Sequence, residues 1–154
     1  MSFEIFIKKA KNQGLIKEQE RNFNSIDKMV SRAYVEISAA KANMKIDQGV
    51  AFTVTYTAML HAGRALMLFK GYRPSDGYQH KTVVDFTASL FGEKYRTLTQ
   101  HFDKMRRKRN IFTYEVSISF SETEVNNALK SAENFIQAVR EMIESEDPQH
   151  KFKF

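Results

Sequence analysis

The architecture of this chain follows from residues 48–70, which read QGVAFTVTYTAMLHAGRALMLFK. Between Val50 and Phe69, 14 of the 20 residues are apolar, and at helical spacing they cover most sides of a helix. The β-branched residues at its start favour a strand by propensity, but the length of the stretch and the Ala-Met-Leu run that follows favour a helix. His61 and Arg64 interrupt it, and such polar groups argue against a membrane span. Residues 48–70 therefore predict a buried helix that other helices surround.

Two amphipathic helices are predicted on either side of this central helix. Apolar or small residues recur at helical spacing within residues 20–46, and again from Val125 to Ile143. Ser121 and Glu124 form a capping box that marks the start of the second helix. Each of these helices therefore has one apolar stripe to bury against the central helix.

The remaining segments predict shorter helices and connections. A short helix is expected near residues 80–91 and a longer one near 93–110, with an extra short helix in the first dozen residues, and the Gly- and Pro-containing stretch 71–77 predicts a loop. Residues 116–120 alternate like a strand, but no other segment offers a partner strand, so we expect an extended connector. The sequence therefore predicts an all-α fold, a single up-and-down helical bundle with a four- or five-helix core.

Composition limits the classes of protein that this chain can represent. Its 154 residues include 24 Lys+Arg and 18 Asp+Glu, for a net charge of +6, and 42% of them are hydrophobic. This is too apolar for a disordered chain, and the absence of cysteine excludes a disulfide scaffold, a thiolate nucleophile and a zinc ribbon. We expect one domain over residues 1–154, with its core at about 20–146 and a flexible basic tail at 147–154. Because no export signal is evident, we expect a cytoplasmic protein without a membrane association.

No metal site and no cofactor are expected. None of the four histidines has another histidine three or four residues away on a helix, and none lies beside a carboxylate cluster on a helix face. Residues 71–77 lack the Gly-Lys-Ser/Thr ending of a phosphate-binding loop, and no serine occupies a nucleophile elbow. The corresponding classes of enzyme are therefore set aside.

The densest charge lies at residues 104–109, which hold five cations in six positions. At 100° per residue these cations surround much of a helix, and their mutual repulsion is relieved by a polyanion. An arginine guanidinium matches a phosphate group in shape and charge, so a phosphate-bearing partner is one interpretation. The other is that cations complement the dipole at a helix C-terminus on a solvated face. The charge run alone leaves both open.

Four features in order along the chain resemble one known family. They are the central string 56–66, the turn 71–74, His80 at the opening of the next helix, and Arg109-Asn110 followed by Tyr114, which together read R-N-I-F-T-Y. This combination resembles the HEPN domains, named for higher eukaryotes and prokaryotes nucleotide-binding. The signature of that family is Arg, commonly followed by Asn, Asp or His, and then His four to six residues after the Arg. The similarity is clearest from about residue 50 to 115.

The resemblance implies a helical bundle that forms a homodimer, with the Arg motif near the dimer cleft. Many HEPN proteins are metal-independent endoribonucleases, often toxins encoded beside a small nucleotidyltransferase partner. In such members the arginine would stabilise charge on the reacting phosphorus, and the histidine would act as an acid or base. By resemblance, Arg109 and Asn110 take the places of the first two motif residues.

Tyr114 departs from this pattern because it stands where the catalytic members carry histidine. An unperturbed tyrosine has a pKa of about 10, so only about one in a thousand is phenolate at pH 7. Cleavage would need Arg106 or Arg107 to favour the phenolate, or His80 or His101 to supply the imidazole from elsewhere in the fold. Three interpretations remain: RNA cleavage, a scaffold or partner-binding role, and binding of a nucleotide or RNA phosphate without cleavage, which we favour.

Six residues are predicted to contact the nucleotide or RNA: Arg64, His80, Arg106, Arg107, Arg109 and Asn110. Two of them have an alternative role. Arg64 would either reach the same cleft as Arg109 or form an ion pair with Asp85 or Asp103, and the ion pair is favoured. His80 would either join the site or cap its helix.

Overall fold

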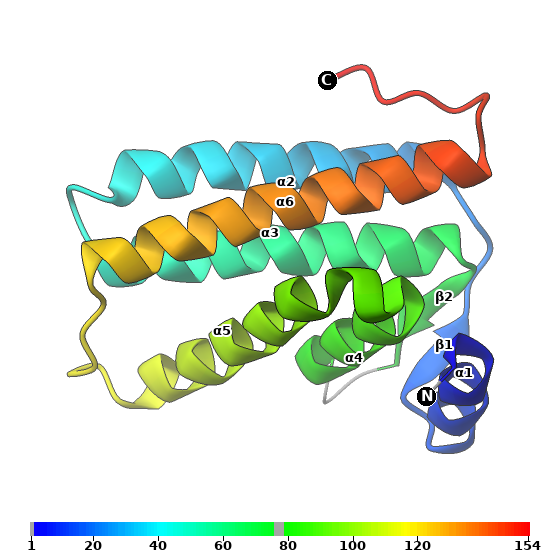
Figure 1. Ribbon diagram of the computed structural model, residues 1–154, viewed down its shortest axis with the longest axis horizontal. Coiled ribbons are helices and arrows are strands. Elements are labelled where there is room, and N and C mark those ends of the chain that lie inside the picture. Colours follow the sequence, from blue (N-terminus) through cyan, green and yellow to red (C-terminus); the bar gives the residue numbers. More distant parts are fainter. Residues whose placement is uncertain (1, 76–78) are drawn as a thin grey trace.

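The computed structural model describes residues 2–75 and 79–154, and over these residues the chain is an all-α bundle, as predicted. Figure 1 shows the order of the elements along the chain. The elements are α1 (Phe3–Asn12), β1 (Ile16–Glu18), α2 (Phe23–Asn43), α3 (Gln48–Phe69), β2 (Tyr72–Pro74), α4 (Gln79–Phe91), the 3₁₀ helix η1 (Gly92–Tyr95), α5 (Arg96–Tyr114) and α6 (Glu122–Glu146). The predicted short N-terminal helix is α1.

Helix α3 lies at the centre of the bundle. In Figure 1, α2 and α6 lie on one side of α3, and α4 and α5 lie on the other. Most of α3 is buried, including Tyr56, Met59 and Leu66, which are each 0% exposed. Glycine allows one of its neighbours to approach closely, because a Cβ at Gly63 would lie only 2.5 Å from Cγ1 of Val83 in α4. The central helix predicted from residues 48–70 is confirmed, and α4 is held tightly against it.

Side-chain caps set the starts of the three long helices. Asn22 Oδ1 accepts a hydrogen bond from the Ser25 amide at the start of α2, and Asp47 does the same for Val50 at the start of α3. At the start of α6, Ser121 Oγ accepts from the Glu124 amide at 3.0 Å. Because a cap satisfies an amide that lacks a partner inside the helix, each one fixes where its helix begins. The start predicted from the Ser121 capping box is confirmed.

Two short strands and a longer α5 differ from the prediction. Strands β1 and β2 pair antiparallel, with Lys17 opposite Arg73, and three residues are too few to show an alternating pattern in the sequence. The loop predicted at 71–77 therefore contains β2, and its last two residues, 76 and 77, lie outside the described part of the chain. The connector at 116–120 forms no strand, as predicted, while α5 runs on to Tyr114 instead of ending near residue 110.

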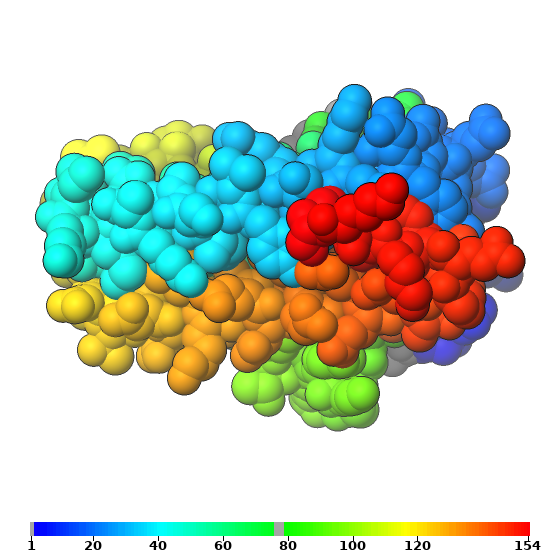
Figure 2. All heavy atoms as spheres, turned by 90° about the horizontal axis from the view of Figure 1, so that it is seen from above, coloured from blue at the N-terminus to red at the C-terminus, as the bar shows by residue number. Residues whose placement is uncertain are grey.

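The C-terminal residues 147–154 form no helix or strand but pack against the bundle. His150 lies 2.8 Å from Asp27 Oδ1 of α2, and its ring stacks on Phe23 with the centroids 4.3 Å apart. Phe152 is only 8% exposed, so its ring is covered by the bundle in this structure. Figure 2 shows this segment, in red, lying over α2 and α6. Within the described residues, no helix is both long enough and apolar enough to span a membrane.

Candidate functional site

Residues of three helices line one small cavity beside the end of α5. The cavity has a volume of about 240 Å³, and Arg109 is its one contribution from α5. Helix α4 contributes Gln79 and His80, and α3 contributes Thr57, Leu60, His61 and Arg64. The close approach of α4 to Gly63 brings His80 over α3. The structure therefore brings together three of the predicted contact residues, Arg64, His80 and Arg109.

His80 is held in this cavity by a buried tyrosine. Its Nδ1 lies 3.0 Å from the hydroxyl of Tyr56, which is 0% exposed. Burial lowers the pKa of His80 from its ordinary value of 6.5, and the nearby charges of Arg109, Arg64 and Arg106 lower it further. Burial also raises the pKa of Tyr56 well above 10, so its phenol remains protonated at neutral pH. If the phenol donates to Nδ1, neutral His80 carries its own proton on Nε2.

His61 is the second imidazole of the cavity, and a buried carboxylate orients it. Its Nδ1 lies 2.7 Å from Oε1 of Glu36 in α2, and Glu36 is only 5% exposed. The other carboxylate oxygen lies 3.4 Å from Nε of Arg32. Because an ionised carboxylate can only accept, Nδ1 of His61 is the donor in this bond, and Nε2 is left to act as an acceptor in the neutral ring. His61 therefore has the arrangement of a general base fixed in one tautomer.

The pairing of Glu36 with His61 is not evident from the sequence. The two residues are 25 positions apart and meet only because α2 packs on α3. One signal was present, since Glu36 lies three residues after Ala33 and four before Ala40 on the apolar stripe of α2. A carboxylate on a buried helix face requires a partner, and this position could have prompted a search for one.

Arg64 does not form the ion pair that was favoured from the sequence. Its Nη2 donates to Oε1 of Gln79, and among the described residues no carboxylate oxygen lies within 4 Å of its guanidinium. Asp85 is occupied by Lys81, four residues before it on α4, at 2.6 Å. Asp103 is occupied by neighbouring arginines on α5. Arg64 instead lines the same cavity as Arg109, and its contact with a phosphate stays a prediction.

Arg109 differs from the three cations directly before it in the run 104–109. Arg106 and Arg107 both pair with Asp103, at 2.9 and 3.3 Å, and Lys108 lies 2.6 Å from Glu124. Arg109 donates to Oδ1 of Asn110 at 3.4 Å, and no carboxylate of the described residues lies within 4 Å of it. The two carboxylates reduce the charge of the run from +5 to 5 − 2 = +3.

Tyr114 and His101 lie outside the cavity of Arg109. Tyr114 is the last residue of α5, and it is 86% exposed. The imidazole of His101 lies 2.5 Å from the hydroxyl of Ser131 on α6 and lines other cavities. The structure thus places His80 beside Arg109, together with His61, and places Tyr114 in solvent.

The described residues contain no group of three or more histidine, aspartate or glutamate side chains that could hold a metal ion. The charged and imidazole groups that line the Arg109 cavity are Arg64, Arg109, His61 and His80. Such groups can bind a phosphate and exchange protons with it.

A family model matches most of the chain. The family model described as HEPN domain matches residues 26–142, which extend from α2 to α6. This range includes every residue that lines the Arg109 cavity, together with Glu36 and Tyr56. No curated protein matches the chain.

Proposed function

Because the chain belongs to the HEPN domain family, we propose that it binds a phosphate group of RNA or of a nucleotide in the cavity lined by Arg109. One observation carries this proposal: Arg64, His80 and Arg109, from three different helices, line a single cavity. No carboxylate of the described residues pairs with either arginine, so their charges favour an anionic ligand. Asn110 supports the site by accepting a hydrogen bond from Arg109.

Binding is tested by the fluorescence anisotropy of a labelled single-stranded RNA in the presence of EDTA. Replacing Arg109 with Ala removes one charged hydrogen-bonding partner of the phosphate, and we expect the affinity to fall about tenfold. Arg96→Ala is the matched control, because Arg96 pairs with Glu93, its side chain is 63% exposed and it does not line this cavity. The affinity of the wild-type protein should also fall as salt is raised from about 50 to 200 mM. Undetectable binding at low salt would overturn the proposal.

Metal-independent RNA cleavage is a second candidate, and a specific observation favours it. Two imidazoles, His61 and His80, line the cavity of Arg109, although the motif position itself carries Tyr114. In the reaction, one imidazole would take the proton of a ribose 2′-hydroxyl, whose oxygen attacks the phosphorus. The other would protonate the departing 5′-oxygen, leaving a 2′,3′-cyclic phosphate and a 5′-hydroxyl. Arg109 would stabilise the negative charge of the transition state. An exposed Tyr114 has no role in this scheme.

Cleavage is tested by incubating the purified protein with labelled RNA in EDTA. Products that end in a cyclic phosphate and disappear in the Arg109→Ala variant would support the enzyme. If the wild-type protein binds RNA but yields no products, the binding function stands without cleavage.

The biological setting that we propose rests on the family. It is a toxin–antitoxin or defence-type system in the cytoplasm, in which the protein forms a homodimer and pairs with a small nucleotidyltransferase. Light scattering on the purified protein tests the homodimer, and co-expression with the product of a neighbouring gene tests the partner. If no RNA or nucleotide binds, a dimeric scaffold or partner-binding module replaces the phosphate-binding function.

A further inference from the structure

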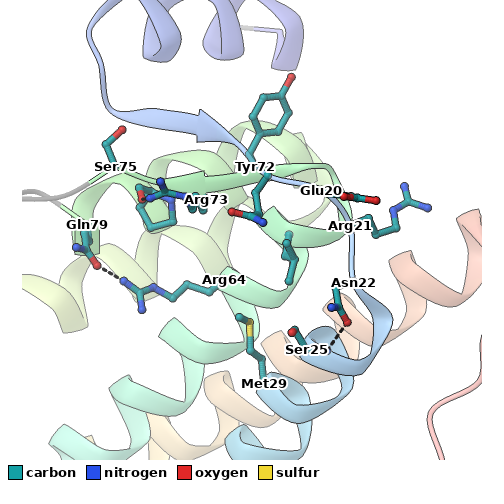
Figure 3. Close-up of a pocket in the computed structure, with 13 residues that line it drawn as sticks. Glu20, Arg21, Asn22, Ser25, Met29, Arg64, Tyr72, Arg73, Ser75 and Gln79 are labelled. Atoms are coloured by element: carbon teal, nitrogen blue, oxygen red, sulfur yellow. Dashed lines mark hydrogen bonds between the residues drawn. The ribbon is translucent and has the colours of Figure 1, made fainter.

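A second and larger cavity lies on the other side of Arg64. Its volume is about 630 Å³, and it is bounded by residues 19–22, the first turns of α2, the end of α3, strand β2 and Gln79. Figure 3 shows Arg64 reaching toward Gln79 on one side, with Ser25 of α2 and the capping residue Asn22 opposite. Ligand cavities of about 300–1,000 Å³ accommodate molecules of nucleotide size.

The charged groups around this cavity favour an anion. Arg21, Arg64 and Arg73 line it together with one acid, Glu20, for a net charge of 3 − 1 = +2. Among the described residues, no carboxylate oxygen lies within 4 Å of these three guanidinium groups. Arg21 is also fixed in place, since its Nε donates to the carbonyl oxygen of Phe69 at 2.7 Å and its guanidinium carbon lies 4.2 Å from the Phe69 ring centroid. A guanidinium that is already ordered loses less entropy when a phosphate binds.

The uncharged lining suits a nucleobase. Met29, Leu68 and Pro74 provide apolar surface, and the side chains of Gln19 and Ser25 provide hydrogen-bonding groups. Unpaired bases in RNA are recognised by this combination of apolar contact and hydrogen bonds to their edges. A base within a duplex is stacked and paired, and it could not enter such a cavity. The cavity therefore favours a single strand.

Arg64 and Gln79 line both this cavity and the smaller cavity of Arg109. We propose that the two cavities hold successive nucleotides of one single-stranded RNA, with the phosphodiester between them bound at Arg64. The larger cavity would then be the subsite for the neighbouring base, and the ligand of the protein would be an RNA strand instead of a mononucleotide. This inference rests on the proposed function, because it takes the Arg109 cavity as the first phosphate site.

The test compares ligands of increasing length under conditions that prevent cleavage. The probes are a nucleoside monophosphate, a dinucleotide and a tetranucleotide, all with 2′-O-methyl groups, which block attack by the 2′-oxygen. Because the dinucleotide can occupy both cavities, we expect it to bind at least about tenfold more tightly than the monophosphate, as one charged hydrogen bond contributes about this much.

Two variants address the larger cavity alone. Arg73→Ala removes an exposed cation of the cavity, and Met29→Trp fills part of its volume. Each should remove most of the gain in affinity with length while leaving the affinity for the monophosphate unchanged. Arg96→Ala is the control, because Arg96 is 63% exposed and lines neither cavity. Thermal unfolding shows whether Met29→Trp is folded, and Arg73→Ala carries the test if it is not.

The outcomes separate this inference from the proposed function. If the monophosphate binds in a manner that depends on Arg109 but the dinucleotide binds no more tightly, only the second subsite is overturned. The same holds if Arg73→Ala and Arg96→Ala reduce the gain with length equally. If no probe binds at low salt, the proposed function fails and this inference fails with it.

Discussion

The two faces of α5 carry similar groups, but these groups have different partners on each face. Toward α6, Lys108 lies 2.6 Å from Glu124, and His101 lies 2.5 Å from the Ser131 hydroxyl. Toward α3 and α4, Arg109 lines a cavity with the imidazole of His80, and no described carboxylate pairs with it. A cation and a histidine thus occur on both faces. On the α6 face Glu124 offsets the charge of Lys108, whereas Arg109 on the other face has no carboxylate partner among the described residues.

The largest difference between the faces is expected in RNA cleavage. If the protein cleaves RNA, His61→Ala removes an acid or base of the reaction, and such groups contribute about 10²- to 10⁴-fold to the rate. His101→Ala should change the rate by less than about threefold, because His101 lies on the α6 face and its imidazole already contacts Ser131. The measurement is the single-turnover cleavage rate in EDTA at saturating protein. Equal losses in the two variants would show that the faces do not differ in this way.

The second comparison concerns the free energy of unfolding, for a buried carboxylate and a partly exposed one. Glu36→Ala removes the buried carboxylate that binds His61 and Arg32, whose side chains are 33% and 61% exposed, and loss of a buried charged hydrogen-bond partner costs about 1–3 kcal/mol of unfolding free energy. Glu124→Ala removes the partner of Lys108 on the α6 face, where both side chains are partly solvated, and should cost about 1 kcal/mol or less. Urea unfolding of both variants at neutral pH measures the difference. A loss from Glu36→Ala no larger than that from Glu124→Ala would contradict a structural role for the buried carboxylate.

The Arg109 cavity should take up protons when RNA binds. Free His80 has a pKa below its ordinary value because it is buried near Arg109, Arg64 and Arg106, so it is largely neutral at pH 7. A bound phosphate opposes these effects and favours the protonated ring, and the complex then binds more protons than the free protein. Affinity must therefore rise as pH falls below about 6.5, by at most about tenfold per pH unit for one proton.

The internal phosphodiesters of an RNA do not titrate in this range, so RNA binding between pH 8 and 5.5 measures the response of the protein. His80→Gln should flatten this profile. His101→Gln should leave it unchanged, although burial also lowers the pKa of His101, because that ring lies on the other face of α5. If His101→Gln flattens the pH profile instead, the phosphate binds on the face of α5 toward α6.

The sequence predicted what depends on periodicity and on neighbours along the chain. The apolar spacing of α2, α3 and α6 and the cap at Ser121 were read correctly, because each is a local pattern. Arg109 and His80 were recognised as candidates through the order of family-like segments, and the family was identified correctly.

Side-chain pairing between distant segments was not predictable in the same way. The pairs Glu36–His61 and Lys108–Glu124 join residues 25 and 16 positions apart, and they depend on how helices pack. The misassignment of Arg64 has the same origin. Asp85 and Asp103 were plausible partners of Arg64 in the sequence. Each of them pairs instead with a cation three or four residues away on its own helix.

The smallest expected effect comes from removing the charge that pairs with Lys108 on the face of α5 toward α6. Glu124→Gln removes the negative charge that neutralises Lys108 and leaves the volume of the side chain unchanged. If pairing is what keeps this face from binding RNA, the variant gains one available cation, and its affinity for RNA at low salt should rise a few-fold. The slope of log affinity against log salt should steepen by up to about one unit, because each additional phosphate contact releases about one counterion.

Lys41 and Glu133 provide a matched pair, 3.1 Å apart and joining α2 to α6, and Glu133→Gln frees a cation away from α5. If the gain in RNA affinity is larger for Glu124→Gln than for Glu133→Gln, the α6 face of α5 lies near the bound RNA. Pairing with Glu124 is then what keeps Lys108 from contacting it. Equal gains mean that the RNA does not reach this face, and that Arg109 alone connects α5 to the ligand.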